Sequence, residues 1–206
     1  SVQGGVIIKE LADTTTGNIT VANGAAFALG AGVTDGAGQT INIAGPGLTA
    51  VKDGYAAVQR GSITALTGSN TWAGNIVFDA TPNTRIGVQD SANLTISGNI
   101  TESVAGSIIA FRHGNAIGGN ITLSGTGNNW TGATQIYGGG GAFILGANNT
   151  LPAAALLQVG TSSIAGASTL DLNGFQQAAA GLNRVNEDGI NPAYITNNGA
   201  VDATLT

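Results

Sequence analysis

The 206-residue chain contains no cysteine, a single histidine and very few charged side chains. Without cysteine, neither disulfide bonds nor thiol chemistry can contribute. Charged residues make up 8% of the chain, against roughly 25% in ordinary soluble domains. Six basic residues and a net charge of −5 argue against nucleic-acid binding, which needs a basic surface. Zinc and redox-metal sites are not expected, because they use several His or Cys ligands.

Long apolar runs are also missing. No stretch approaches 18 consecutive apolar residues, so we expect no membrane insertion of this segment. Ser1 leads into a sequence without the basic start and apolar core of a signal peptide. This indicates either that a signal was removed or that the chain is an excised segment.

Glycine and small apolar residues dominate what is present. The chain has 34 Gly and 42% hydrophobic residues, mostly Ala, Ile, Leu and Val, with few aromatics. Charge-driven disorder is therefore not expected. Collagen would require Gly at every third position, which does not occur. The composition suits thin layers of small side chains better than a thick globular core.

Alternation of apolar and polar residues predicts strands throughout the chain. It occurs at Thr40–Ile43, Leu94–Ile96, Ile121–Leu123 and Thr169–Leu172. Gly, Asn and Asp interrupt these segments, as tight corners require. The best helical candidate, Pro152–Gln158, is short, so we predict an all-β protein with almost no helix.

One segment of the chain occurs twice. Ile63–Gly74 and Ile121–Gly132 share Ile, Thr, Asn, Trp and Gly at one constant offset. Such a long period indicates stacked repeat units, each burying its apolar face against the next. A second recurrence is the tetrad Gly-Asn-Ile-Thr, which starts at Gly17, Gly98 and Gly119, with Gly-Asn-Ile-Val at Gly74. Sandwich strands face different neighbours, whereas equivalent positions of stacked coils touch one another, so self-similarity favours a solenoid.

The spacing between Gly98 and Gly119 fits coils of roughly 20 to 24 residues. We therefore predict one elongated domain over residues 1–206, with divergent coils over 1–62 and recognisable repeats over 63–206. Its fold is predicted to be a right-handed parallel β-helix of roughly nine coils, about 40–45 Å long at ~4.8 Å per coil.

Three segments resemble the autotransporter-associated β-strand repeat: Leu94–Ile100, Ile121–Gly132 and Leu145–Pro152. That repeat typically reads Leu-Thr-Leu-Ser-Gly, then Asn-Thr-Tyr-Thr-Gly, a strand, and a Leu-Gly and Leu-Pro turn. Trp130 stands at the usual Tyr position. The resemblance covers about Ile63 to Thr206. It implies a β-helical passenger or surface fibre, secreted or held on a bacterial cell surface. Such repeats usually continue for many copies, whereas this chain stops after about two.

Candidate catalytic groups form no recognisable cluster. His113, beside Arg112 and Gly114, is expected to be a turn residue with its ring in solvent. Glycosidases need two carboxyl groups roughly 5 to 10 Å apart, but the eleven acidic residues are scattered. Only coil stacking could pair distant acids such as Asp79 and Glu102. The nonapeptide that binds calcium in other solenoids is absent. We predict no enzymatic activity, no catalytic residue, no cofactor and no metal site, with incidental loop calcium left open.

Asparagine and tryptophan recur at repeated positions. Six Asn-x-Ser/Thr triplets occur, at Asn18, Asn93, Asn99, Asn120, Asn129 and Asn148. They are glycan acceptors in eukaryotic secreted proteins, but we interpret them here as structural ladders. Trp72 and Trp130 could stack on sugars, yet their Gly-rich apolar surroundings favour packing at a recurring corner.

The leading hypothesis is an extracellular structural protein: a solenoid stalk, or a fibre subunit that joins identical copies end to end through its β edges. The candidate self-association residues are Val6, Ile7, Ile8, Leu11, Val201 and Leu205. The alternative is an adhesive passenger segment that binds extracellular glycans or host surface proteins. A polysaccharide-degrading β-helix enzyme is disfavoured for want of a catalytic cluster.

Overall fold

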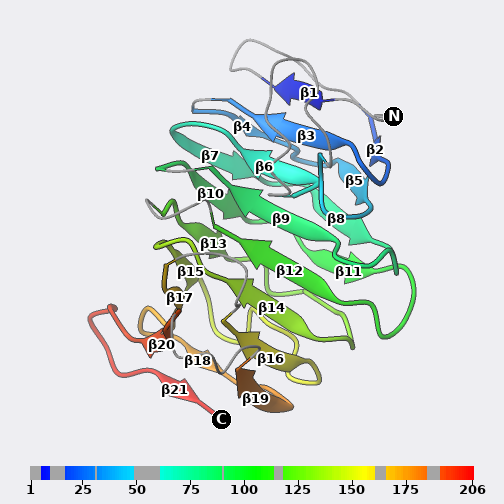
Figure 1. The fold of residues 1–206 in the computed structure, drawn as a ribbon. Helices are drawn as coiled ribbons and strands as arrows, with labels where there is room; N and C mark the ends of the chain where they lie inside the picture. The colour runs from blue at the N-terminus through cyan, green and yellow to red at the C-terminus, as the bar shows by residue number, and fades with distance from the viewer. Residues whose placement is uncertain are drawn as a thin grey trace.

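The computed structural model describes residues 6–9 (backbone only), 17–30, 32–48, 61–89, 91–113, 118–160, 166–184 and 191–206. Parallel strands stack into a β-solenoid, and no helix occurs among these residues (Figure 1). The predicted all-β parallel solenoid is therefore confirmed. In the described part of the chain no helix is long and apolar enough to cross a membrane.

Three parallel sheets form the walls, and each is named by its number of described strands. The eight-stranded sheet contains β1 (Val6–Lys9), β3 (Ala26–Leu29), β6 (Ile63–Ala65), β9 (Arg85–Val88), β12 (Ile109–Arg112), β14 (Thr134–Tyr137), β16 (Leu156–Val159) and β19 (Gly181–Arg184). The seven-stranded sheet contains β4 (Thr34–Asp35), β7 (Ser69–Trp72), β10 (Asn93–Ile96), β13 (Ile121–Leu123), β15 (Ala142–Leu145), β17 (Ser168–Asp171) and β20 (Ala193–Thr196). The four-stranded sheet contains β2 (Ile19–Val21), β5 (Thr40–Ile43), β8 (Asn75–Phe78) and β11 (Ile100–Glu102). A short pair, β18 (Gln176–Gln177) and β21 (Thr204–Leu205), follows near the C-terminus.

The turns from β2 to β13 visit the three sheets in a fixed order. The chain runs from the four-stranded sheet to the eight-stranded and then the seven-stranded sheet, as in β8, β9 and β10, followed by β11, β12 and β13. Figure 1 shows this stack, with β1 near one end and β19 to β21 at the other. All strand pairs between successive turns are parallel. The two ends of the stack are consequently unlike.

The solenoid makes about six turns, somewhat fewer than the roughly nine coils expected. The strand register explains the difference. Ile63 pairs with Ile86, and Ile86 pairs in turn with Phe111, so these two coils are of similar length. The coil before them is much longer, because Phe27 pairs with Ile63. Corner loops lengthen a turn without changing its strands, so coil number does not follow from chain length divided by the shortest spacing.

Stacked apolar side chains fill the interior. In the four-stranded sheet Ile19, Ile41, Ile76 and Ile100 lie in one register row, and all four are buried. Three of them, all but Ile41, belong to the Gly-Asn-Ile-Thr or Gly-Asn-Ile-Val tetrads, so those copies do stack as predicted. Each fully buried Ile contributes roughly 1.5–3 kcal/mol relative to an exposed one. The rows therefore join successive turns into one core.

The two copies of the long repeat do not stack on the same face of the solenoid. Ile63 lies in the eight-stranded sheet, whereas its counterpart Ile121 lies in the seven-stranded sheet. Trp72 is the last residue of β7 in the seven-stranded sheet. Trp130 lies beside the four-stranded sheet instead, because its neighbour Asn129 forms a parallel bridge with Thr101 of β11. The offset between the two copies therefore corresponds to two full turns plus the step from the eight-stranded to the seven-stranded sheet. The expectation that both tryptophans occupy equivalent positions of the coil is wrong, because the same strand-and-corner segment fits more than one face.

Candidate functional site

Asparagine side chains connect the turns along the outside of the solenoid. The Oδ1 atoms of five triplet asparagines accept backbone N–H bonds from the following turn. These bonds are Thr40 to Asn18, Asn120 to Asn93, Gly127 to Asn99, Ala142 to Asn120 and Gln176 to Asn148, at 2.9–3.3 Å. Each such bond contributes about 1 kcal/mol. The structural interpretation of these five triplets is confirmed.

Both tryptophans belong to the core. Trp72 and Trp130 are fully buried. Trp72 packs edge-to-face on Phe27 at 5.5 Å between ring centres, and Trp130 packs on Phe78 at 6.2 Å. Trp130 Nε1 donates to Thr134 Oγ1 at 2.9 Å. Neither ring can therefore stack on an external sugar, and the expectation of internal packing is confirmed.

His113 is not the solvent-exposed turn residue that the sequence predicts. Its side chain is fully buried, and Nδ1 lies 2.9 Å from the backbone oxygen of Tyr137. Burial lowers the pKa of His113 below its usual value of 6.5, while the carbonyl groups of Tyr137 and Ala142 act in the opposite direction. The imidazole is therefore neutral at neutral pH. Its place is structural, because it continues the inward-facing row of Ile109 and Phe111.

We expect this buried imidazole to make the fold less stable in weak acid. Because the folded-state pKa lies below 6.5, the unfolded chain binds the proton more readily as the pH falls below that value. His113 then contributes a loss of at most about 1.4 kcal/mol per pH unit. Urea unfolding of the wild type and His113→Gln at pH 7.5 and 5.0 measures this effect. An equal pH dependence in both proteins would contradict it.

The carboxylates of Asp79 and Glu102 hold corner loops in place by accepting hydrogen bonds. Glu102 accepts hydrogen bonds from the backbone of Ser107 at 3.0 Å, and from the backbone and hydroxyl of Thr131 at 2.9 and 2.8 Å. Asp79 Oδ1 accepts from the backbone of Thr81 at 2.9 Å. In the strand register Glu102 lies opposite Phe78 rather than Asp79. Within the described residues no group of three or more His, Asp or Glu side chains could hold a metal ion.

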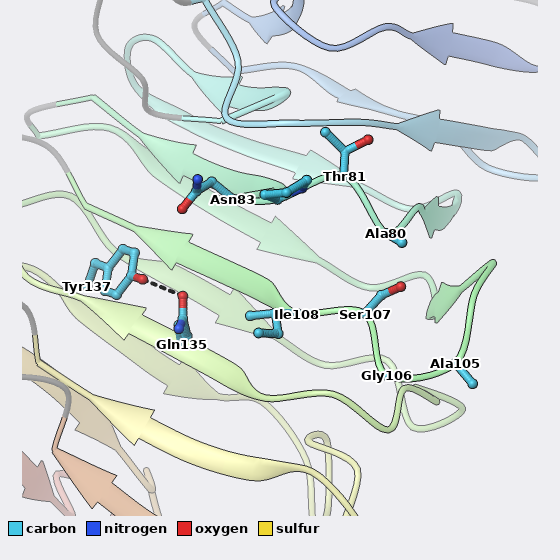
Figure 2. Close-up of a pocket in the computed structure, with 10 residues that line it drawn as sticks. Ala80, Thr81, Asn83, Ala105, Gly106, Ser107, Ile108, Gln135 and Tyr137 are labelled. Carbon is cyan, nitrogen blue, oxygen red and sulfur yellow. Dashed lines mark hydrogen bonds between the residues drawn. The ribbon is translucent and has the colours of Figure 1, made fainter.

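A hollow of about 360 Å³ opens at the corner between the four-stranded and eight-stranded sheets. We call it the corner groove. Figure 2 shows that its walls come from the loop after β8, the loop after β11, and β14. It is lined by Ala80, Thr81, Pro82, Asn83, Ala105, Gly106, Ser107, Ile108, Gln135 and Tyr137. Its described lining contains no charged group, and it offers hydroxyls, amides, one aromatic ring and several apolar side chains.

Hydrogen bonds hold the polar wall of the corner groove in place. The Tyr137 hydroxyl donates to Gln135 Oε1, and Gln135 Nε2 donates to Gln158 Oε1 at 2.8 Å on the next turn. Burial raises the pKa of Tyr137, while the nearby Arg85 and Arg112 act to lower it. Arg85 also lies over the ring, 5.8 Å from its centre. The phenol is therefore neutral at physiological pH and held in one orientation.

A second hollow, of about 370 Å³, adjoins the first. It lies along the same corner over earlier turns, and Thr81 lines both hollows. Its other lining residues are Thr20, Val21, Ala22, Asn23, Asn42, Ile43, Ala44, Val77, Asp79 and Ser103. Together the two hollows follow the corner from β2 and β5 to β14.

Comparison with protein-family models, curated proteins and solved structures yields no match. The resemblance to autotransporter-associated repeats therefore stays a prediction.

The C-terminal end of the solenoid is the second candidate site. Six large apolar side chains of the described residues are exposed, and four of them lie in the last turn: Leu182, Tyr194, Ile195 and Val201. Leu182, Arg184, Ala193 and Ile195 also line a hollow of about 340 Å³ with Val159. The remaining two, Val104 and Ile108, lie on the loop beside the corner groove.

The self-association residues predicted from the sequence fall at both ends. Val6, Ile7 and Ile8 lie in β1, which pairs with β3 at the edge of the eight-stranded sheet. Leu11 lies outside the described residues. Val201 is 64% exposed, whereas Leu205 packs partly against the core. Sequence reasoning missed Leu182, Tyr194 and Ile195, because alternation alone does not say which strand is the last of its sheet.

Proposed function

We propose that this chain is an extracellular structural protein, a β-solenoid stalk or fibre subunit whose copies join end to end through their β edges. One observation carries the proposal. The last described turn exposes apolar side chains at the point where β19 and β20 end their sheets. Unpaired strand edges beside exposed apolar residues are a template for pairing with another chain. The occupant we assign is the opposite end of a second copy.

The parallel topology determines what such a joint produces. β19 is the outermost strand at one edge of the eight-stranded sheet, and β1 is the outermost strand at the other. Stacking β1 of one copy on β19 of another continues the parallel ladder in the same direction. A contact between unlike ends is heterologous, so it propagates into a filament unless the rotation closes a ring.

Electron microscopy of the purified chain tests this proposal. We expect filaments whose length grows with protein concentration, with a width of one solenoid. Deleting residues 1–12 removes β1 and should leave short rods under the same conditions, because the eight-stranded sheet loses its N-terminal strand. Circular dichroism of the deletion variant controls for folding. An intact chain that remains monomeric at high concentration would overturn the fibre, and would favour a stalk segment that does not self-associate.

The alternative function, an adhesive passenger segment, is favoured by a separate observation. The corner groove is a hollow with an aromatic ring and several uncharged hydrogen-bonding groups, away from both ends of the stack. Adhesion through this groove is compatible with a structural role, since the groove and the ends do not overlap.

A further inference from the structure

We propose that the corner groove binds an uncharged saccharide chain that lies along the axis of the solenoid. This inference does not depend on end-to-end association, because none of the residues that line the two hollows belongs to β1, β19 or β20, the strands of the proposed joint.

The lining of the groove matches the chemistry of a sugar ring. Sugars present hydroxyl groups around their edge and C–H groups on their faces. Asn83 supplies a side-chain amide and Thr81 a hydroxyl, and these two groups can both donate and accept. Gln135 adds a carbonyl oxygen that keeps a second lone pair for accepting, beside its bond from Tyr137. Pockets in which a few placed polar groups interrupt apolar walls are typical of small-molecule sites.

Tyr137 and Ile108 supply the apolar surfaces. An aromatic ring with a polar end offers a large rigid contact area together with a hydrogen-bonding group. The Tyr137 ring is half-buried and held by Gln135. Ile108 is 45% exposed although it is a large apolar side chain. Figure 2 shows it between the loop that carries Asn83 and the strand that carries Gln135. A bound sugar would cover both surfaces.

The groove is formed before any ligand arrives. Glu102 holds the backbone of Ser107, and Thr131 Oγ1 accepts from the backbone of Gly106 at 2.8 Å. On the opposite wall, Thr84 Oγ1 donates to the carbonyl of Thr81 at 2.9 Å. Walls that are already ordered do not have to lose conformational freedom on binding, which lowers the cost of association.

The neighbouring hollow indicates a chain rather than a single sugar. Because Thr81 lines both hollows, a ligand that fills the first can continue into the second. The second hollow reaches β2 and β5, whereas the first reaches β14, so the path crosses several turns of ~4.8 Å each. A linear polymer fits this path.

The charges beside the two hollows favour a neutral ligand. Arg85 lies over the Tyr137 ring at the first hollow, which disfavours a cationic ligand. Asp79 lines the second hollow, which disfavours an acidic polysaccharide. A peptide would be recognised through main-chain pairing at an exposed sheet edge. The strands beneath the groove already pair with neighbours on both sides.

The test is titration calorimetry and saturation-transfer NMR with neutral oligosaccharides of glucose, xylose and N-acetylglucosamine, at 50 and 500 mM salt. We expect at least one to bind with an affinity that salt does not change, since no charge pair forms. Tyr137→Ala should weaken binding at least tenfold, and Tyr137→Phe should weaken it less, because the ring is kept. Tyr194→Ala is the matched control, as Tyr194 is a half-exposed tyrosine at the far end, and it should bind normally.

A second variant keeps the proposal testable if Tyr137→Ala unfolds. Ile108→Asp changes an exposed side chain, so the fold should survive while the apolar wall of the groove is lost. It should also weaken binding at least tenfold. The proposal is overturned if no neutral oligosaccharide binds at millimolar concentration, or if Tyr194→Ala weakens binding as much as the groove variants do. Binding of uronic-acid oligomers or of peptides alone would overturn it too.

Discussion

Replacing Leu182 and Ile195 by aspartate is expected to convert filaments of the intact chain into short soluble rods. Both side chains lie in the last turn, 55% and 39% exposed, and both line the hollow at that end. In the proposed joint they become buried. Burial of a Leu or Ile side chain contributes roughly 1.5–3 kcal/mol, and an unpaired buried carboxylate is unfavourable by more than the loss of that contribution.

The expected change in the concentration needed for assembly follows from these free energies. Because about half of each side chain is already buried, losing the two contacts removes at least about 1.4 kcal/mol from each joint, which raises the protein concentration needed for assembly at least about tenfold. Sedimentation of a concentration series measures this concentration directly, and microscopy identifies the product. Filaments that form at the wild-type concentration would show that the last turn is not the joint.

The matched control for this experiment is Val104→Asp. Val104 is 52% exposed, comparable to Leu182, but it lies on the loop after β11, away from the ends. This variant should assemble like the wild type. Equal losses in both would instead point to lateral packing of solenoids through the corner loops.

Local pattern was sufficient to predict the strands. The alternating segments Thr40–Ile43 and Ile121–Leu123 coincide with β5 and β13. The short Ala-rich stretch that was the best helical candidate contains the start of β16 instead, with Leu157 and Val159 buried. Each strand has one face toward a thin core, and this constraint acts on neighbouring residues, so it is visible in a short window of sequence.

The burial of His113 agrees with the alternation of the sequence, although its polar and glycine neighbours favour a turn. Ile109, Phe111 and His113 occupy alternate positions, which places all three on the same face of an extended chain. The neighbouring Arg112 and Gly114 suggested a turn. Because the ring bonds to the Tyr137 carbonyl one turn away, its burial depends on a partner that sequence spacing alone does not reveal.

The corner groove could not be found from the sequence. Its walls at Asn83, Ile108 and Gln135 meet only because of the particular length of each coil, which fixes the strand register. A small error in coil length would bring other side chains together. The same variability explains why the two copies of the long repeat lie on different faces. Sites that span several turns therefore require the register, which the corner loops set.

Replacing Arg184 by leucine is expected to strengthen assembly through the proposed joint. Arg184 lies opposite Val159 in the register of β19 and β16. The same register row leads back through Ile136, Phe111, Ile86, Ile63 and Phe27 to residue 7 of β1. If β1 of one copy continues this register on β19 of another, residue 184 meets residue 7. The guanidinium of Arg184 is then removed from water beside an apolar row, which is unfavourable without a partner charge.

Arg184→Leu should assemble at a concentration at least about tenfold lower than the wild type, because an apolar side chain of that size contributes about 1.5 kcal/mol or more when buried. Arg184→Glu keeps a charge at the same position and is the matched control, so it should not assemble better than the wild type. Both variants lose the hydrogen bond from Arg184 to the Asn191 carbonyl at 2.9 Å, so that loss cannot explain a difference between them. Sedimentation of a concentration series measures each assembly concentration. Equal assembly of the two variants would mean that residue 184 is not buried in the joint.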